Sequence, residues 1–252
     1  MQVYVINLER NPERLEFIGQ RLESINIDFN RIDAVDGYAL DKKYIEEFRE
    51  TSKRPTGWKE GQIGCFLSHR KVWQVIVDGE AEYGVILEDD LHISSALKGI
   101  ISNLNWIPKD ADVIRLESTT NWVKLTKLGH VNNRDICLVN NDTWGAGAYV
   151  LSKKTARFLL EQDPAIWLPA DTYIFAKSLS DTARALKIYQ LNPVLVCQDK
   201  YAEGVVDSNQ IRLFDSEIEV GHSGVSSIFD FKKTLKIFVA PLLGYTKTQF
   251  KD

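Results

Sequence analysis

The chain opens with a strand–helix–strand pattern, and this pattern constrains the fold more than any other feature of the sequence. Residues 3–6 are apolar and mostly β-branched, which is typical of a buried strand. Asn11 and Pro12 suit the start of a helix, and residues 13–24 then carry apolar side chains at helical spacing. Residues 27–34 return to a strand pattern. Such a unit predicts parallel strands with a helix packed on one face.

The remaining periodic segments fit the same kind of domain. We expect helices over 42–50, 63–77 and 154–160, a partly helical stretch over 169–179, and strands over 85–87, 111–116, 147–151, 186–191 and 194–197. The polar stretches 51–61 and 199–227 are expected to be loops. We therefore predict an α/β domain over residues 1–227, with a mostly parallel central sheet flanked by helices, followed by a tail over 228–252.

The composition is that of an ordinary globular domain, since 44% of the 252 residues are hydrophobic and 26% are charged. The net charge of −4 gives no reason to expect a nucleic-acid partner, so an anionic ligand needs local basic groups, a helix end or a metal ion. Cys65, Cys137 and Cys197 form no paired motif and are expected to be reduced, buried thiols. The sequence shows no signal peptide and no apolar run near the ~18 residues that span a bilayer, so we expect a cytoplasmic protein.

Three consecutive carboxylates, Glu88, Asp89 and Asp90, follow the apolar run of residues 85–87. Ligands bind beyond the carboxyl ends of strands in open α/β sheets. Carboxylates crowded at such an end raise one another's pKa, and a divalent cation such as Mg²⁺ or Mn²⁺ removes that penalty. In an extended segment Glu88 and Asp90 would project to the same side. The alternative is that the three acids cap the next segment or face solvent.

Several blocks together resemble a known enzyme family. They are "VINLERNPERLEFI" at the start, "AVDG" at 34–37, "GQIGCFLSHRKVW" at 61–73, "VILEDD" at 85–90, "WGAGAYVLSKKTARFLL" at 144–160 and "LPADTYIF" at 168–175. In this order they resemble the lipopolysaccharide glycosyltransferases of glycosyltransferase family 25, which are similar to the collagen galactosyltransferases. The resemblance spans about the first 200 residues, and it is the order of the blocks that makes it specific.

The resemblance implies a GT-A fold and transfer of a hexose, typically galactose from UDP-galactose, with inversion at the anomeric carbon. It implies Mn²⁺ or Mg²⁺ as cofactor. The acceptor implied is a saccharide of the lipooligosaccharide core of a Gram-negative bacterium. UDP-glucose is the alternative donor.

The same resemblance assigns the donor-binding residues. They are Asn7, Leu8, Arg10 and Arg14 near the first strand's end, Asp36 after the second strand, Gly64, Ser68 and His69 in the 61–73 block, Glu88 and Asp89 in the triplet, and Gly145 and Gly147 in the 144–160 block. Other roles stay open for several of them. Arg10 suits a surface position at a helix start, Asp36 a turn bond before a glycine, and His69 a packed helix face.

The metal ligands implied are Asp90 and Glu88, with His222 as a further candidate because many GT-A enzymes use a late histidine. A solvent-facing role is the alternative for His222. Inversion in one displacement requires a base near the acceptor hydroxyl. Asp171 in "PADTYIF" is the expected base, and Glu117 after the 111–116 strand is the reserve. The alternative for Asp171 is a helix N-cap.

Residues 228–243 mix lysines with apolar side chains, as an amphipathic segment on an anionic membrane surface does. We therefore expect peripheral association with the inner membrane; a C-terminal helix docked on the domain is the alternative. Two other enzyme classes fit less well. A nucleotidyltransferase usually has a glycine-rich loop where "NLERNPERL" has none, and an aspartyl-phosphate phosphatase needs an acid where Asn7 stands. A non-catalytic binding protein with this fold remains a third possibility.

Overall fold

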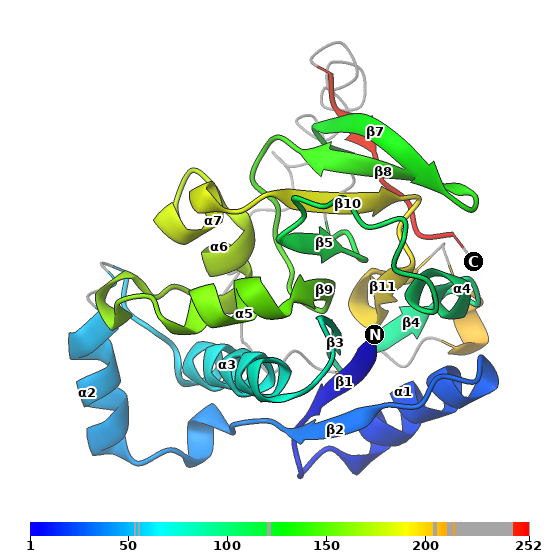
Figure 1. The fold of residues 1–252 in the computed structure, drawn as a ribbon. Coiled ribbons are helices and arrows are strands. Elements are labelled where there is room, and N and C mark those ends of the chain that lie inside the picture. The colour runs from blue at the N-terminus through cyan, green and yellow to red at the C-terminus, as the bar shows by residue number, and fades with distance from the viewer. Residues whose placement is uncertain are drawn as a thin grey trace, which may run out of the picture.

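The centre of the fold is a sheet with the strand order β2-β1-β3-β9-β5-β10-β8-β7 (Figure 1). The structure is a computed structural model that describes residues 1–52, 54, 56–119, 122–203, 206–210, 214 and 244–251. The strands are β1 (Gln2–Asn7), β2 (Asn30–Asp33), β3 (Tyr83–Leu87), β5 (Val113–Arg115), β7 (Leu125–Val131), β8 (Arg134–Val139), β9 (Ala148–Ser152) and β10 (Ile188–Asn192). Two smaller sheets pair β4 (Leu91–Ile93) with β11 (Val196–Gln198), and β6 (Trp122–Val123) with β12 (Thr246–Lys247).

The central sheet is mixed, which corrects the prediction of a mostly parallel sheet. β1 is parallel to both β2 and β3, as the strand–helix–strand opening predicts, and β5 is parallel to β10. β9 is antiparallel to β3 and β5, and β8 is antiparallel to β10 and β7. The β7–β8 hairpin needs no crossover helix. Because β7 is largely exposed, its residues carry no buried-strand pattern.

Helices cover both faces of this sheet (Figure 1). Their bounds are α1 (Pro12–Ser24), α2 (Lys42–Ser52), α3 (Glu60–Asp78), α4 (Leu97–Ile101), α5 (Lys153–Leu160), α6 (Ala170–Phe175) and α7 (Asp181–Ala185). α1, α2, α3, α5 and α6 confirm predicted helical segments; α4 and α7 are too short for the sequence pattern to show.

Two cores lie on opposite faces of the sheet. Along β1, Val3 and Val5 pack in one core with residues of α1, whereas Tyr4 and Ile6 pack in the other with residues of α3. This alternation follows from the two-residue period of a strand. The predicted α/β class is therefore confirmed, with β1 buried on both faces between the two helices.

The described end of the chain packs on the domain. Thr246 and Lys247 of β12 pair with Val123 and Trp122 of β6, and Phe250 forms an isolated bridge with Val194, between β10 and β11. The remainder of the predicted tail, 228–243, lies outside the described residues, as does His222, so the domain boundary at 227 stays a prediction. Within the described ranges, none of the helices is long and apolar enough to cross a membrane.

Candidate functional site

Two neighbouring clefts open where the parallel strands end. The first cleft is lined by Leu8, Arg10, Arg14, Val35, Asp36, Ser68, His69, Asp89 and Asp90, among others. The second is lined by Gln62, Thr119, Trp144, Gly145, Pro169, Asp171 and Tyr201, among others. Cys65, Glu88 and Lys200 line both clefts, so these three residues mark the junction.

The first cleft forms because the carboxyl ends of β1, β2 and β3 meet the first turns of α3. Gly37 and Gly64 allow this approach: a Cβ on Gly64 would lie 2.5 Å from the carbonyl oxygen of Val35. Ser68 fixes the contact, since its Oγ accepts from the Val35 amide at 2.8 Å and donates to the Gly64 carbonyl at 2.7 Å. Gly64 therefore allows α3 to pack against the residues that follow β2. Ser68 lines the cleft and is held in place by its two hydrogen bonds.

Asp89 is held in a buried network at the floor of the first cleft. Its two oxygens accept from Asn7 Nδ2 at 2.8 Å and from Arg14 at 3.1 Å. Burial raises the pKa of Asp89, although both donors act in the opposite direction. With both oxygens engaged, Asp89 orients Arg14 toward the cleft. Asn7 lies behind this network, 1% exposed, and does not line either cleft.

Asp90 differs from Asp89 because its carboxylate is not satisfied. Oδ1 is buried and has no hydrogen-bond partner among the residues that the structure describes. Burial, and then the charge of Glu88, raises the pKa of Asp90 to about 7. The chain bends at Asp89 and Asp90 rather than running extended, and all three acids line the first cleft. An unsatisfied buried carboxylate beside a second one is the environment that a hard divalent cation stabilises.

Glu88 is the acidic residue at the junction. Its Oε2 accepts from Gln198 Nε2 at 3.2 Å, and its Oε1 lies 3.6 Å from His69 Nε2. Burial acts to raise the pKa of Glu88, but His69 and Lys200 outweigh it, so the pKa is lowered. Glu88 is therefore an anion facing both clefts. Glu88 and Asp90 fit a Mg²⁺ or Mn²⁺ ion that keeps positions for phosphate oxygens and water.

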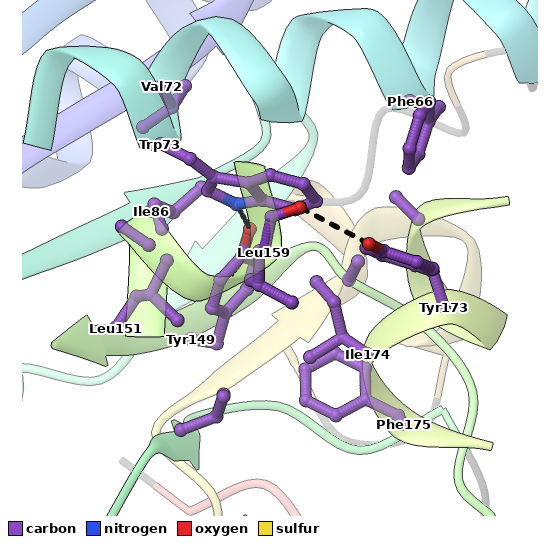
Figure 2. Packing of buried hydrophobic residues seen from close by; sticks show 14 of the residues in the cluster. Phe66, Val72, Trp73, Ile86, Tyr149, Leu151, Leu159, Tyr173, Ile174 and Phe175 are labelled. Atoms are coloured by element: carbon purple, nitrogen blue, oxygen red, sulfur yellow. Dashed lines mark hydrogen bonds between the residues drawn. The ribbon is translucent and has the colours of Figure 1, made fainter. Parts of the chain in front are cut away.

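His69 is anchored from the core side. Its Nδ1 lies 2.9 Å from the Tyr149 hydroxyl, which also accepts from Trp73 Nε1 at 2.9 Å. Figure 2 shows Trp73 of α3 and Tyr149 of β9 joined in this way within the hydrophobic cluster. His69 therefore both packs against the core and lines the cleft. Its Nδ1 faces Tyr149 in the core, and its Nε2 faces Glu88.

Asp36 and Arg10 form the outer wall of the first cleft. Arg10 Nε lies 3.3 Å from Asp36 Oδ2. The other Asp36 oxygen accepts from the Tyr38 amide at 3.0 Å, which is the turn bond left open as an alternative. Since both residues also line the cleft, neither of the alternative roles removes them from the site.

Asp171 lines the second cleft and not the first. One of its oxygens accepts from the Thr172 amide at 2.6 Å and the other from the Gly145 amide at 3.3 Å. Because α6 starts at Ala170 with Pro169 as N-cap, Asp171 is in the first turn and is not the N-cap. Gly145 has a φ of 86°, a conformation that favours glycine, so the turn that faces Asp171 depends on it.

Glu117 lies beneath the second cleft and lines neither cavity. It is 1% exposed, and its Oε1 accepts from the Gly147 amide at 2.5 Å. Burial raises its pKa to about 8, so it is largely a neutral acid at pH 7. A Cβ on Gly147 would lie 2.6 Å from Gln198 Nε2, so a side chain there would displace the amide that donates to Glu88. Glu117 and Gly147 support the site from below.

Lys200 lines both clefts and was not predicted from the sequence. It follows β11, whose pairing with β4 brings residues 196–198 beside 91–93. Asp199 fixes the next turn: its amide donates to the Asp90 carbonyl at 2.7 Å, and its carboxylate lies 2.6 Å from His92 Nε2. No local signal singles out Lys200 in a polar stretch, because its place in the site depends on a pairing across more than a hundred residues.

Comparisons with known proteins identify the family of the chain. A model of "Glycosyltransferase family 25 (LPS biosynthesis protein)" matches residues 1–174, so the chain belongs to glycosyltransferase family 25. This membership confirms the family resemblance noted in the sequence.

Its relatives include enzymes of bacteria and animals. The lacto-N-neotetraose biosynthesis glycosyltransferase LgtE of Neisseria meningitidis serogroup B is 26% identical over 258 residues, or 94% of this chain and 90% of that protein. Procollagen galactosyltransferase 1-B of Xenopus laevis is 28% identical over 223 residues, or 79% of this chain but 36% of that protein.

Solved structures match more distantly. A glycosyltransferase involved in glycosylation of the major capsid of PBCV-1 gives a TM-score of 0.41 at 8% identity, covering 83% of this chain and 97% of that one. The galactosyltransferase LgtC with donor and acceptor sugar analogs gives 0.36 at 9% identity, covering 72% and 66%. At these scores the matches carry no argument about the site.

Proposed function

We propose that this glycosyltransferase moves a hexose, galactose from UDP-galactose, onto a saccharide of the lipooligosaccharide core, with inversion of the anomeric centre. The observation that carries the proposal is the pair of clefts meeting at Glu88: one is lined by charged groups, and the other contains a carboxylate beside exposed aromatic rings. A nucleotide sugar needs a charged site for its diphosphate, and a neutral saccharide needs a site with few charges and with surfaces for stacking. The names of the relatives, which include a procollagen galactosyltransferase, favour galactose.

The first cleft is the proposed donor site. Arg10, Arg14 and Lys200 bring positive charge to a cavity that a diphosphate would otherwise enter against the acidic triplet. Arginine pairs with phosphate through parallel hydrogen bonds. Leu8 and Val35 offer apolar contact for the nucleoside, and Asp36 offers an acceptor for its hydroxyl or imide groups.

Glu88 and Asp90 are the proposed ligands of Mn²⁺ or Mg²⁺. When bound, the ion would supply Lewis-acid stabilisation of the charge on the departing diphosphate. The protein's own contribution is to hold Arg14 through Asp89 and Lys200 through Asp199, so that positive charge is already in place.

Asp171 is the proposed general base in the second cleft. Its carboxylate accepts the proton of the acceptor hydroxyl while that oxygen forms a bond to the anomeric carbon, and the bond from that carbon to UDP breaks on the opposite face. Trp144 and Tyr201, which are 42% and 47% exposed, present ring faces on which an acceptor sugar can stack. Glu117 is not used in this scheme, because it lies outside both clefts.

The test is release of UDP from UDP-galactose, measured beside UDP-glucose, with Mn²⁺ and with EDTA, in the presence of truncated oligosaccharide acceptors. The proposal expects cation-dependent turnover with UDP-galactose and a product whose anomeric configuration is inverted relative to the donor. Faster turnover with UDP-glucose than with UDP-galactose would show that glucose, not galactose, is the sugar transferred. Absence of binding and hydrolysis for both donors would overturn the enzymatic proposal in favour of a non-catalytic protein.

Cytoplasmic location with association at the inner-membrane surface is the remaining part of the proposal. It is supported by the basic, partly apolar sequence of residues 228–243, which lie outside the described residues. A lipid-anchored acceptor would place such a segment near its substrate.

A further inference from the structure

Three side chains of different chemistry meet at the junction of the two clefts. Ligand atoms of Cys65, His69 and Glu88 all lie within 4.8 Å of one another. Cys65 and His69 are four residues apart on α3, so both project from the same face of the helix. Glu88 approaches from the end of β3. Neither Asp89 nor Asp90 belongs to this group, which adds sulfur and nitrogen to the oxygen of Glu88.

His69 is prepared to act as a ligand. It is 1% exposed, and its Nε2 has no hydrogen-bond partner among the residues that the structure describes. This nitrogen faces Glu88 Oε1 at 3.6 Å, while Nδ1 lies 2.9 Å from the Tyr149 hydroxyl. Metal-binding histidines usually bond an oxygen through their second ring nitrogen, which fixes the ring and the tautomer. Tyr149 provides that oxygen and is itself held by Trp73 (Figure 2).

Thiolate, imidazole and carboxylate together are a ligand set suited to zinc. Zn²⁺ binds sulfur, nitrogen and oxygen in tetrahedral geometry, and three protein ligands leave one position open. Mn²⁺ and Mg²⁺ prefer oxygen ligands, so the thiol discriminates against them. Because Cys65 and Glu88 line both clefts, the open position is reachable from solvent.

We propose that Cys65, His69 and Glu88 bind Zn²⁺ at the cleft junction, with loss of the thiol proton to solvent. The second half of the inference rests on the proposed function: since Glu88 is also a proposed ligand of the catalytic Mn²⁺ or Mg²⁺, zinc bound here withdraws that ligand and inhibits transfer. The site is thus a zinc-sensitive inhibitory site built across the donor and acceptor clefts.

Binding is tested without any nucleotide, by titrating CoCl₂ into the protein as a spectroscopic substitute for zinc. A thiolate-to-cobalt charge-transfer band should appear at one equivalent and be abolished by added ZnCl₂. The band should be lost in Cys65→Ser and retained in the matched variant Cys137→Ser, with circular dichroism confirming that both are folded. Absence of a band in the native chain, or an equal band in Cys65→Ser, would overturn the site.

Tyr149→Phe tests the orientation of the histidine. This variant keeps all three ligands but removes the hydroxyl bonded to Nδ1, so the affinity for Co²⁺ should fall by about 10-fold, within the range for loss of a ligand's supporting hydrogen bond. Unchanged affinity in Tyr149→Phe would show that His69 is not a ligand positioned by this bond, and would overturn the proposed ligand set.

Inhibition is tested as a ratio, the Mn²⁺-supported rate with ZnCl₂ divided by the rate without it. The ratio should be well below one in the native chain and in Cys137→Ser, and should return toward one in Cys65→Ser whatever its own basal rate. Zinc binding with no inhibition would overturn the inhibitory half alone. A chain that shows the cobalt band but turns over neither UDP-galactose nor UDP-glucose would sink the proposed function and leave the zinc site standing.

Discussion

The two clefts share three residues yet differ in how they are built. The first is made by the ends of three parallel strands and the start of α3, and its lining is rich in arginine and carboxylate. The second is made by the turn at 144–147, the start of α6 and the residues after β11, and its lining is mostly uncharged, with exposed aromatic rings. The difference matches a charged donor on one side and a neutral acceptor on the other.

The strongest test of this division is to change Asp171, the acidic side chain that lines the second cleft but not the first. Asp171→Asn should lower kcat by about 1,000-fold, the middle of the range for loss of a general base, while the affinity for UDP stays within a factor of about two. Steady-state kinetics and calorimetric UDP binding measure the two effects. The exposed Asp28→Asn is the matched control. Equal losses of kcat and UDP affinity would place Asp171 in the donor site instead.

Trp144 tests whether the second cleft binds the acceptor saccharide. Trp144→Ala should raise the KM for the saccharide acceptor by about tenfold, as expected for a stacking contact worth ~1.4 kcal/mol, and leave the KM for UDP-galactose unchanged. The control is Leu179→Ala, because Leu179 is also an exposed apolar residue but lines neither cleft. A shift confined to the donor KM would contradict the assignment of the second cleft.

Glu117 tests whether the acid beneath the second cleft is structural. Its pKa of about 8 in the folded protein exceeds the ordinary value of 4.5, so the folded state holds a proton that the unfolded state releases. The contribution of Glu117 to stability is therefore lost as pH rises from about 4.5 through 8. Glu117→Gln keeps an acceptor for the Gly147 amide, so the Tm of this variant relative to native should rise with pH across that window.

Thermal melts at pH 5, 7 and 9 measure this effect, and turnover of Glu117→Gln provides the functional check. The account expects a change in kcat of less than about tenfold, far below that of Asp171→Asn. A difference in Tm that does not vary with pH would show that Glu117 is ionised when buried, and a loss of kcat as large as that of Asp171→Asn would restore it as the base.

The smallest expected effect concerns the segment beyond both clefts. Replacing Lys232, Lys233 and Lys236 with glutamine should reduce sedimentation with anionic liposomes, at about 1 kcal/mol per lysine near the surface, and leave turnover of a water-soluble acceptor unchanged. Substitution is preferable to truncation, because Thr246, Lys247 and Phe250 pair with the domain. Equal liposome binding by the native chain and the variant would remove the membrane part of the proposal.

The donor cleft was more predictable from the sequence than the acceptor cleft, for a physical reason. Leu8 and the acidic triplet directly follow short buried strands, and Asp36 lies just beyond β2. The ends of parallel strands lie together whatever the details of the fold. Asp171 came only from the family resemblance, since its meeting with Gly145 depends on tertiary packing.

The features that the sequence did not predict are those that depend on pairing between strands far apart in the chain. Lys200 reaches the site through the β4–β11 pairing, and the mixed character of the sheet comes from β9 inserting between β3 and β5. Neither pairing leaves a periodic signal in the residues themselves. The bend at Asp89 and Asp90 likewise replaced the extended geometry that strand periodicity suggested.

The central claim is that Glu88 and Asp90 hold a divalent cation that in turn holds the nucleotide in the first cleft. Its most direct test is calorimetric binding of UDP to the native chain and to Asp90→Asn, each with Mn²⁺ and with EDTA. The account predicts tight binding by the native chain only with Mn²⁺, and weak binding by Asp90→Asn in both conditions. Equal UDP affinity for the native chain in Mn²⁺ and in EDTA, unchanged in Asp90→Asn, would contradict it.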